Sequence, residues 1–209
     1  MMRIESLKTS PDRSGRYWVK LDNGDKIALY RQTVEDLSLY AGKELSEQEW
    51  TALEEAAGAM SAKMRAVRIV AASSVSKKDL QQRLVRKGED PKQAAEAVAW
   101  MEDLHLVDDE DTARQIVTRC VARGYGISRA KQMLYEKKIP QHLWDSVLTD
   151  FPDQTEHILA FLQSRADELS DPKGAKKAID ALLRRGHRYS EIRNALALLA
   201  LDMDEFPEE

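Results

Sequence analysis

Few side chains in this sequence have the types and spacing that catalysis or metal binding requires. The histidines His105, His142, His157 and His187 are widely separated, and none lies at metal-ligand spacing from another or from the single cysteine, Cys120. The sequence contains neither a GxxxxGK[ST] phosphate loop nor a GxGxxG stretch after a predicted strand. Nothing in the sequence supports a catalytic nucleophile paired with a base. We therefore expect a protein without enzyme activity, metal or cofactor.

The acidic run VDDED, residues 107–111, is the one stretch that resembles a cation site. Carboxylates at the start of a helix cap free backbone N–H groups and complement the helix dipole, and the segment DDEDTARQIV reads as such a start. We therefore interpret the run as a helix N-terminus. The two glycines of RGYGIS, residues 123–128, lie between two predicted helices and predict a helix-breaking turn.

Basic side chains are the remaining candidates, and their chemistry is the binding of negatively charged partners. The net charge is −4, but residues 112–150 carry seven basic and three acidic side chains, and residues 173–195 carry seven basic and two acidic. Acidic segments alternate with these blocks. The pattern predicts a basic stripe on an acidic protein, or solvated helix faces of mixed charge.

The elements that position these residues begin with a β-hairpin. RYWVKLDNGDKIALY alternates apolar and polar residues around Asn23-Gly24, a strong hairpin turn signal. In GKELSEQEW, Ser46 and Glu49 form a capping box, and Leu45 and Trp50 occupy hydrophobic staple positions. We therefore expect a hairpin, followed by a helix that begins at about residue 47.

The rest of the chain is predicted to be helical, with roughly ten helices and short connections. In VSKKDL, Ser76 is a helix cap and Asp79 its acidic partner. Pro91 suits a first helical turn. Pro140, Pro152 and Pro172 fall at further breaks.

Three segments align without a gap and reveal an internal repeat of about 50 residues. They are QRLVRKGEDPKQAAEAV from Gln82, QMLYEKKIPQHLWDSVL from Gln132 and DALLRRGHRYSEIRNAL from Asp180. The apolar positions that coincide, and that we expect in the core, are Leu84, Leu134 and Leu182; Ala94, Trp144 and Ile192; and Val98, Leu148 and Leu196.

Each copy is predicted to form a helix, a tight turn and a second helix, with a further helix in front at roughly 60–73, 110–124 and 154–169. Gly88 and Gly186 supply the left-handed residue that ends a helix, whereas the second copy has Lys138 at this position. The fold class is therefore mainly α: three tandem three-helix repeats forming an elongated array, preceded by a small N-terminal β-hairpin plus helix. The predicted domains are 1–58, 59–106, 107–151 and 152–209.

An elongated array favours binding over catalysis, and two interpretations of its basic residues stay open. In one, units two and three act as helix-turn-helix modules in which Arg129, Lys131, Lys137 and Arg188 contact phosphates. In the other, the array is a scaffold for an acidic protein or a nucleoprotein. One cysteine, no signal sequence and no apolar run long enough for a membrane span predict a cytoplasmic protein.

Four stretches, in order along the chain, resemble the RecX family of regulatory proteins. The N-terminal hairpin with GKELSEQEW resembles the extension of some members, and SKKDLQQRLVRKG resembles the pattern of the first repeat. VDDEDTARQIVTRCVARGYGISRAKQMLYEKKI is similar to the most distinctive stretch of the family. LLRRGHRYSEIRNAL resembles the closing repeat.

The resemblance implies a curved array, shaped as a crescent, that binds in the groove of the RecA filament on single-stranded DNA. It implies a negative regulator, a monomer that limits strand exchange, ATP hydrolysis and coprotease activity in DNA repair and the SOS response. The alternative is a free-standing helix-turn-helix DNA-binding protein. The residues predicted to contact the partner or nucleic acid come from the two basic blocks: Arg114, Arg119, Arg123, Arg129, Lys131, Lys137, Lys138, Arg184, Arg185, Arg188 and Arg193.

Overall fold

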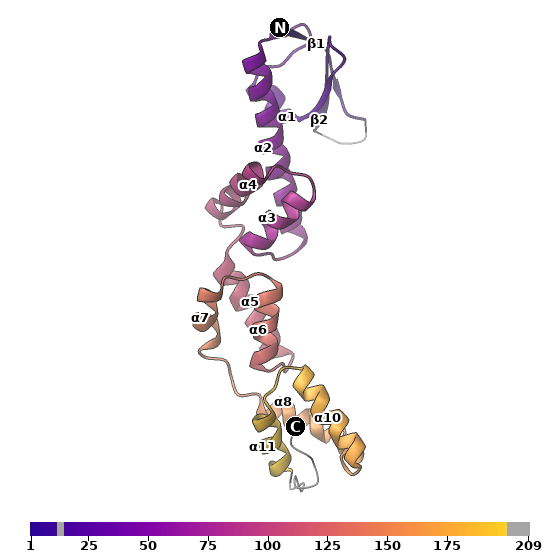
Figure 1. Ribbon diagram of the computed structural model, residues 1–209, viewed down its shortest axis with the longest axis vertical. Coiled ribbons are helices and arrows are strands. Elements are labelled where there is room, and N and C mark those ends of the chain that lie inside the picture. Colours follow the sequence, from indigo (N-terminus) through magenta and orange to yellow (C-terminus); the bar gives the residue numbers. More distant parts are fainter. Residues whose placement is uncertain (12–14, 200–209) are drawn as a thin grey trace. The chain divides into compact units, whose positions relative to one another are not determined.

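The computed structural model describes residues 1–11 and 15–199 and divides into two compact units (Figure 1). The first unit is Met1–Val107, and the second begins at Asp108. Eleven α-helices, one 3₁₀ helix and four short strands form the described part of the chain. The predicted class, mainly α with a small N-terminal β element, is confirmed. Residues 12–14 and 200–209 of the predicted first and last domains lie outside the described residues.

The N-terminal element is a four-stranded antiparallel sheet, which corrects the predicted hairpin. The hairpin around Asn23-Gly24 exists as β2 (Arg16–Leu21) and β3 (Lys26–Tyr30), with Gly24 at φ +94°. The strands β1 (Met2–Thr9) and β4 (Glu44–Leu45) extend it, so that the order is β3-β2-β1-β4. β1 is therefore a central strand that the sequence pattern did not reveal.

A β-bulge explains why the alternation of β1 is hard to recognise. Ile4 lies opposite Leu21, and Leu7 lies opposite Val19, with a register shift between Ile4 and Ser6. The bulge adds one residue, so Ile4 and Leu7 reach the same face of the sheet although three positions separate them. A period of two therefore fails within this strand.

A single long helix, α2 (Glu47–Ala72), links the sheet to the rest of the first unit (Figure 1). The predicted capping box is confirmed, because Ser46 accepts from the Glu49 N–H and Glu49 accepts from the Ser46 N–H. The helix α1 (Arg31–Asp36) precedes it. The boundary predicted between residues 58 and 59 lies inside α2, which continues through it.

The two halves of α2 contribute to two different cores. Leu53 packs with Ile4, Val19, Leu21 and Leu29 under the sheet. Further along, Ala62 and Ala66 pack with side chains of α3 (Lys77–Arg86) and α4 (Pro91–Asp103). Ser76 caps α3, and Pro91 is the first residue of α4, as predicted.

The second unit is entirely helical in its described part. The predicted helix 154–169 is wrong, because two helices occupy this range. The Ser164 hydroxyl donates to the Phe161 carbonyl at 2.7 Å, a local bond that competes with helix continuation. The elements are α5 (Asp109–Ala122), α6 (Ile127–Glu136), η1 (Gln141–Leu143), α7 (Trp144–Leu148), α8 (Thr155–Gln163), α9 (Ala166–Leu169), α10 (Pro172–Arg184) and α11 (Tyr189–Leu198).

The apolar positions that coincide in the three aligned segments are core residues. Leu84, Leu134 and Leu182 are at most 1% exposed. Ala94, Ile192, Val98, Leu148 and Leu196 are buried too, and Trp144 is half-buried against the core of α5 to α7. This part of the prediction is confirmed. The division into three repeats, and the elongated and curved form of the array, stay predictions.

Lys138 adopts the left-handed backbone conformation that glycine provides in the other two copies. Its φ is +57°, against +91° at Gly88 and +88° at Gly186. Because a side chain makes this conformation costly, Lys138→Gly is expected to raise the free energy of unfolding by about 0.5 kcal/mol. Urea unfolding followed by circular dichroism measures the difference.

Lys137→Gly is the matched control, because Lys137 has φ −85° and gains nothing from glycine. It is expected to destabilise the protein. Equal effects of the two substitutions would show that the backbone conformation of Lys138 costs little.

Candidate functional site

The acidic run and the cysteine take part in the fold. Asp108 caps α5 by accepting from the N–H groups of Glu110 and Asp111, as the helix-start interpretation predicted. Cys120 is buried. Within residues 1–11 and 15–199, no three His, Cys, Asp or Glu side chains gather as a metal site would require. In the same residues no helix has the length and apolar character needed to cross a bilayer.

Two turns of the second unit meet and form what we call the joint, residues 124–129 and 185–188. The Gly126 N–H donates to the Arg185 carbonyl at 3.0 Å, and the Ser128 N–H donates to the Gly186 carbonyl at 3.2 Å. His187 Nε2 lies 3.0 Å from the Gly124 carbonyl. The turn between α5 and α6 is thus bonded to the turn between α10 and α11.

Glycine is needed at the joint because the two backbones approach closely. A methyl group on Gly126 would lie 2.1 Å from the Gly186 carbonyl oxygen, and one on Gly186 would lie 2.2 Å from the Arg129 nitrogen. The ring of His157, on α8, also approaches the joint closely, because it would lie 2.7 Å from a methyl group on Gly124. No such approach occurs at Gly88, where a methyl group would meet nothing within 4 Å.

His187 is the buried polar residue of the joint. Its side chain is 4% exposed, and because the Gly124 carbonyl can only accept, Nε2 must carry the proton. Nδ1 has no hydrogen-bond partner. Burial lowers the pKa of His187 and outweighs the Gly124 hydrogen bond and Glu191, which raise it. Protonation would place an unpaired N–H and a charge in the joint.

The lowered pKa of His187 predicts a joint that weakens in acid. Unfolded His187 binds a proton at about pH 6.5, whereas the folded residue does so only at lower pH. Its contribution to stability is therefore complete above about pH 6.5 and is lost as the pH falls below it. The urea midpoint of the protein should be lower at about pH 5.5 than at about pH 7.5. His187→Gln keeps an amide donor but does not titrate, so its midpoint should fall less between the two pH values. An equal fall in both proteins would contradict this role.

Five of the eleven predicted binding residues lie around the joint. Arg123 directly precedes the first segment of the joint, Arg129 ends that segment, and Arg185 and Arg188 begin and end the second. Burial raises the pKa of the Cys120 thiol, and the guanidinium groups of Arg129, Arg119 and Arg123 lower it, so all three lie within electrostatic reach of this thiol. Arg119, Arg123, Arg185 and Arg188 are exposed. The structure therefore concentrates basic side chains where the two turns meet.

An aromatic ring orients one of these arginines, and a carboxylate orients another. The Arg185 guanidinium lies 4.5 Å from the centroid of the Phe161 ring, which Arg165 also approaches at 4.8 Å. Arg129 lies 3.7 Å from Glu136, a long ion pair at a partly exposed position. The ring contact leaves the positive charge of Arg185 uncompensated, whereas Glu136 partly compensates that of Arg129.

The other six predicted residues do not belong to the joint. Arg114 pairs with Glu110 at 2.9 Å, one turn into α5, and this contact raises its pKa. Lys131 is exposed on α6, and Lys137 and Lys138 lie at its C-terminal end. Arg184 is exposed in the last turn of α10, directly before the joint, and Arg193 is exposed on α11.

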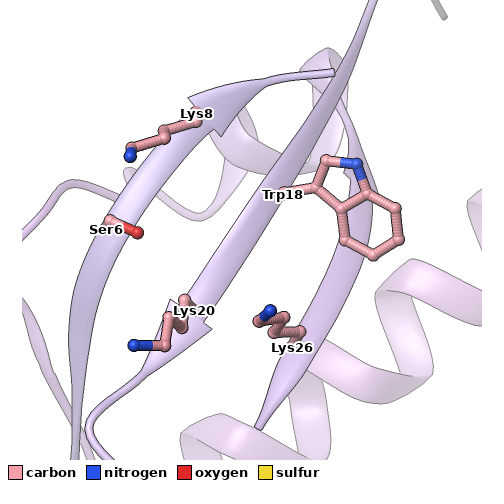
Figure 2. A pocket seen from close by; sticks show the side chains of 5 residues that line it. All are labelled: Ser6, Lys8, Trp18, Lys20 and Lys26. Atoms are coloured by element: carbon pink, nitrogen blue, oxygen red, sulfur yellow. The ribbon is translucent and has the colours of Figure 1, made fainter. Parts of the chain in front are cut away.

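A second basic surface, on the N-terminal sheet, was not predicted from the sequence. Ser6, Lys8, Trp18, Lys20 and Lys26 line a pocket of about 420 Å³ on the face opposite the core (Figure 2). The alternation of Trp18 and Lys20 with buried Val19 and Leu21 could have indicated this face. Its third strand, β1, was not predicted, so the cluster could not be assembled from the sequence.

No family model matches the chain. Similar proteins are nevertheless found by sequence. The chain is 26% identical to the regulatory protein RecX of Clostridioides difficile over 98% of this chain and 97% of the relative. It is 30% identical to the RecX proteins of Chlorobaculum tepidum, over 64% of this chain and 85% of the relative, and Halorhodospira halophila, over 71% and 94%.

Solved structures agree at the level of the fold. A crystal structure of regulatory protein RecX matches with a TM-score of 0.66 at 19% identity, over 93% of this chain and 100% of that chain. RecX from Lactobacillus salivarius matches with a TM-score of 0.60 at 20% identity, over 69% and 98%. Together with the 30% identity over most of two relatives, these matches show that the chain belongs to the RecX family of regulatory proteins.

Proposed function

We propose that this protein is a non-enzymatic negative regulator of the RecA recombinase. It binds as a monomer in the groove of the RecA filament on single-stranded DNA, in the cytoplasm. By doing so it limits strand exchange, ATP hydrolysis and coprotease activity during DNA repair and the SOS response. Membership of the RecX family supports this proposal.

The observation that carries the proposal is the concentration of arginines at the joint. Arg123, Arg185 and Arg188 are exposed there, and Arg184 lies next to them. The turns are fixed by three backbone-directed hydrogen bonds, so the arginines are presented by a rigid support. A surface of this kind suits a nucleoprotein, which offers both acidic side chains and phosphates.

A free-standing helix-turn-helix protein is the second candidate, because α5–α6 and α10–α11 are both helix-turn-helix pairs. Such proteins read DNA with the first residues of the second helix. In this protein the start of α6 is bonded to the turn of residues 185–188, through the N–H groups of Gly126 and Ser128. The joint therefore favours the regulator over the DNA-reading module.

Binding measurements distinguish the two candidates. The protein is titrated onto bare duplex DNA, bare single strand and preformed RecA filament at about 50 mM and about 200 mM salt. The proposal expects the tightest binding to the filament and a weaker dependence on salt than for bare DNA. Tight, sequence-dependent binding to duplex with no preference for the filament would overturn it.

A further inference from the structure

The outer face of the N-terminal sheet carries a cluster that the joint does not explain. We call it the sheet face: Ser6 and Lys8 on β1, Trp18 and Lys20 on β2, and Lys26 on β3 (Figure 2). It belongs to the first unit, whereas the joint belongs to the second.

Folding does not account for the aromatic residue of the sheet face. The core of the sheet lies on the other side, where Ile4, Val19, Leu21 and Leu29 are fully buried. Trp18 is 47% exposed, so a large apolar ring remains in contact with water. An exposed indole beside basic side chains offers a stacking surface to an unpaired base.

The lysines of the sheet face are also unfavourable for folding. Lys20 and Lys26 lie directly opposite each other on β2 and β3, and like charges at such positions destabilise a sheet. Glu5 pairs with Lys20. Lys8 lies opposite Trp18. Within the described residues, neither Lys8 nor Lys26 forms an ion pair with an acidic side chain. The positive charge of the face is thus incompletely compensated.

We propose that the sheet face binds a short segment of single-stranded nucleic acid, two or three nucleotides long. A base stacks on the Trp18 indole, while Lys8, Lys20 and Lys26 contact the adjoining phosphates. Exposed aromatic rings on a sheet, surrounded by basic side chains, bind unstacked bases in this way. In duplex DNA the bases are stacked on one another and offer no free face to the indole.

Neighbouring side chains extend the basic character of the sheet. Arg16, two residues before Trp18, lies over the Tyr30 ring at 4.3 Å from its centroid. The Tyr30 hydroxyl also accepts from Arg68 of α2 at 2.7 Å. The ring of Tyr30 is therefore already occupied, which leaves Trp18 as the stacking platform. An acidic peptide would satisfy the lysines but would leave the indole uncovered.

Fluorescence anisotropy with the whole protein tests the proposal. The probes are labelled oligo-dT and oligo-rU of about eight nucleotides, with oligo-glutamate as the acidic-peptide arm. Trp18→Ala is expected to weaken oligonucleotide binding about tenfold, and Trp18→Phe by less, because phenylalanine retains part of the stacking. Lys8→Gln with Lys26→Gln should reduce the slope of log affinity against log salt by about 1.4.

The matched controls change exposed residues of the first unit that do not line the pocket. They are Tyr40→Ala, at a residue 62% exposed, and the pair Lys78→Gln with Lys92→Gln. Unchanged binding by Trp18→Ala, with an unchanged circular dichroism spectrum, would overturn the proposal. Binding of oligo-glutamate in preference to both oligonucleotides would overturn it too. The same anisotropy measurement with Trp18→Ala, made in a protein whose Arg184, Arg185 and Arg188 are replaced by glutamine, separates binding at the sheet face from binding at the joint.

Discussion

Gly186→Ala is expected to lower the free energy of unfolding by about 3 kcal/mol or more, whereas Gly88→Ala costs about 1 kcal/mol. Both residues follow a helix with nearly the same backbone conformation, φ +88° and +91°. They differ in surroundings: the added methyl group meets open space at Gly88 but would lie 2.2 Å from the Arg129 backbone nitrogen at Gly186. The difference between the two costs therefore measures the close approach of the joint.

Gly126→Ala completes the comparison, because it isolates the close approach from the backbone conformation. Gly126 has φ −75°, which suits any residue, but its methyl group would lie 2.1 Å from the Gly186 carbonyl oxygen. We expect its cost to lie between those at Gly88 and Gly186. Urea unfolding measures the three free energies. Hydrogen exchange should show faster exchange at the Gly126 and Ser128 amides in both joint variants.

Equal costs at Gly88 and Gly186 would contradict the joint as described. So would slow exchange at Gly126 and Ser128 in the Gly186→Ala protein, since both amides donate across the contact that the methyl group must open.

Replacing Arg184, Arg185 and Arg188 together by glutamine is expected to raise the concentration needed for half-maximal inhibition of RecA about 100-fold. Each lost charge contact with the filament is taken as roughly 1 kcal/mol. Glutamine keeps much of the aliphatic chain, so the packing of Arg185 on Phe161 is partly retained. The readout is RecA ATP hydrolysis on single-stranded DNA as a function of the concentration of added protein.

The control removes three charges from the other end of the same helix, with Lys173, Lys176 and Lys177 replaced by glutamine. A small effect of this control beside a large effect of the arginine variant would locate the contact at the joint. Equal effects of the two variants would mean that only total charge matters. Unchanged inhibition by the arginine variant would remove the third aligned segment from the interface.

Local signals made much of the helical architecture predictable. Ser46, Ser76 and Pro91 begin helices as their types and spacing indicate, because caps act within one helical turn. The aligned leucines Leu84 and Leu134 are both fully buried, each in the apolar cluster of its own helices.

Long-range contacts could not be predicted in this way. The strand β1 was not predicted, because its bulge places Ile4 and Leu7 on the same face of the sheet although they are three residues apart. RGYGIS was interpreted as a turn, which it is, but the reason for glycine at residue 126 is the carbonyl of Gly186, 60 residues away in the sequence. Nothing local to either turn indicates that they meet. The sheet face could not be predicted from the sequence either, because its residues come from three strands that pair only in the folded protein.

The DNA-dependent ATP hydrolysis of a RecA recombinase, measured with increasing amounts of this protein, tests the central claim most directly. The proposed function predicts that hydrolysis falls progressively once the filament has formed, without the protein hydrolysing ATP itself. Hydrolysis that stays unchanged at a molar excess of the protein over RecA would contradict it.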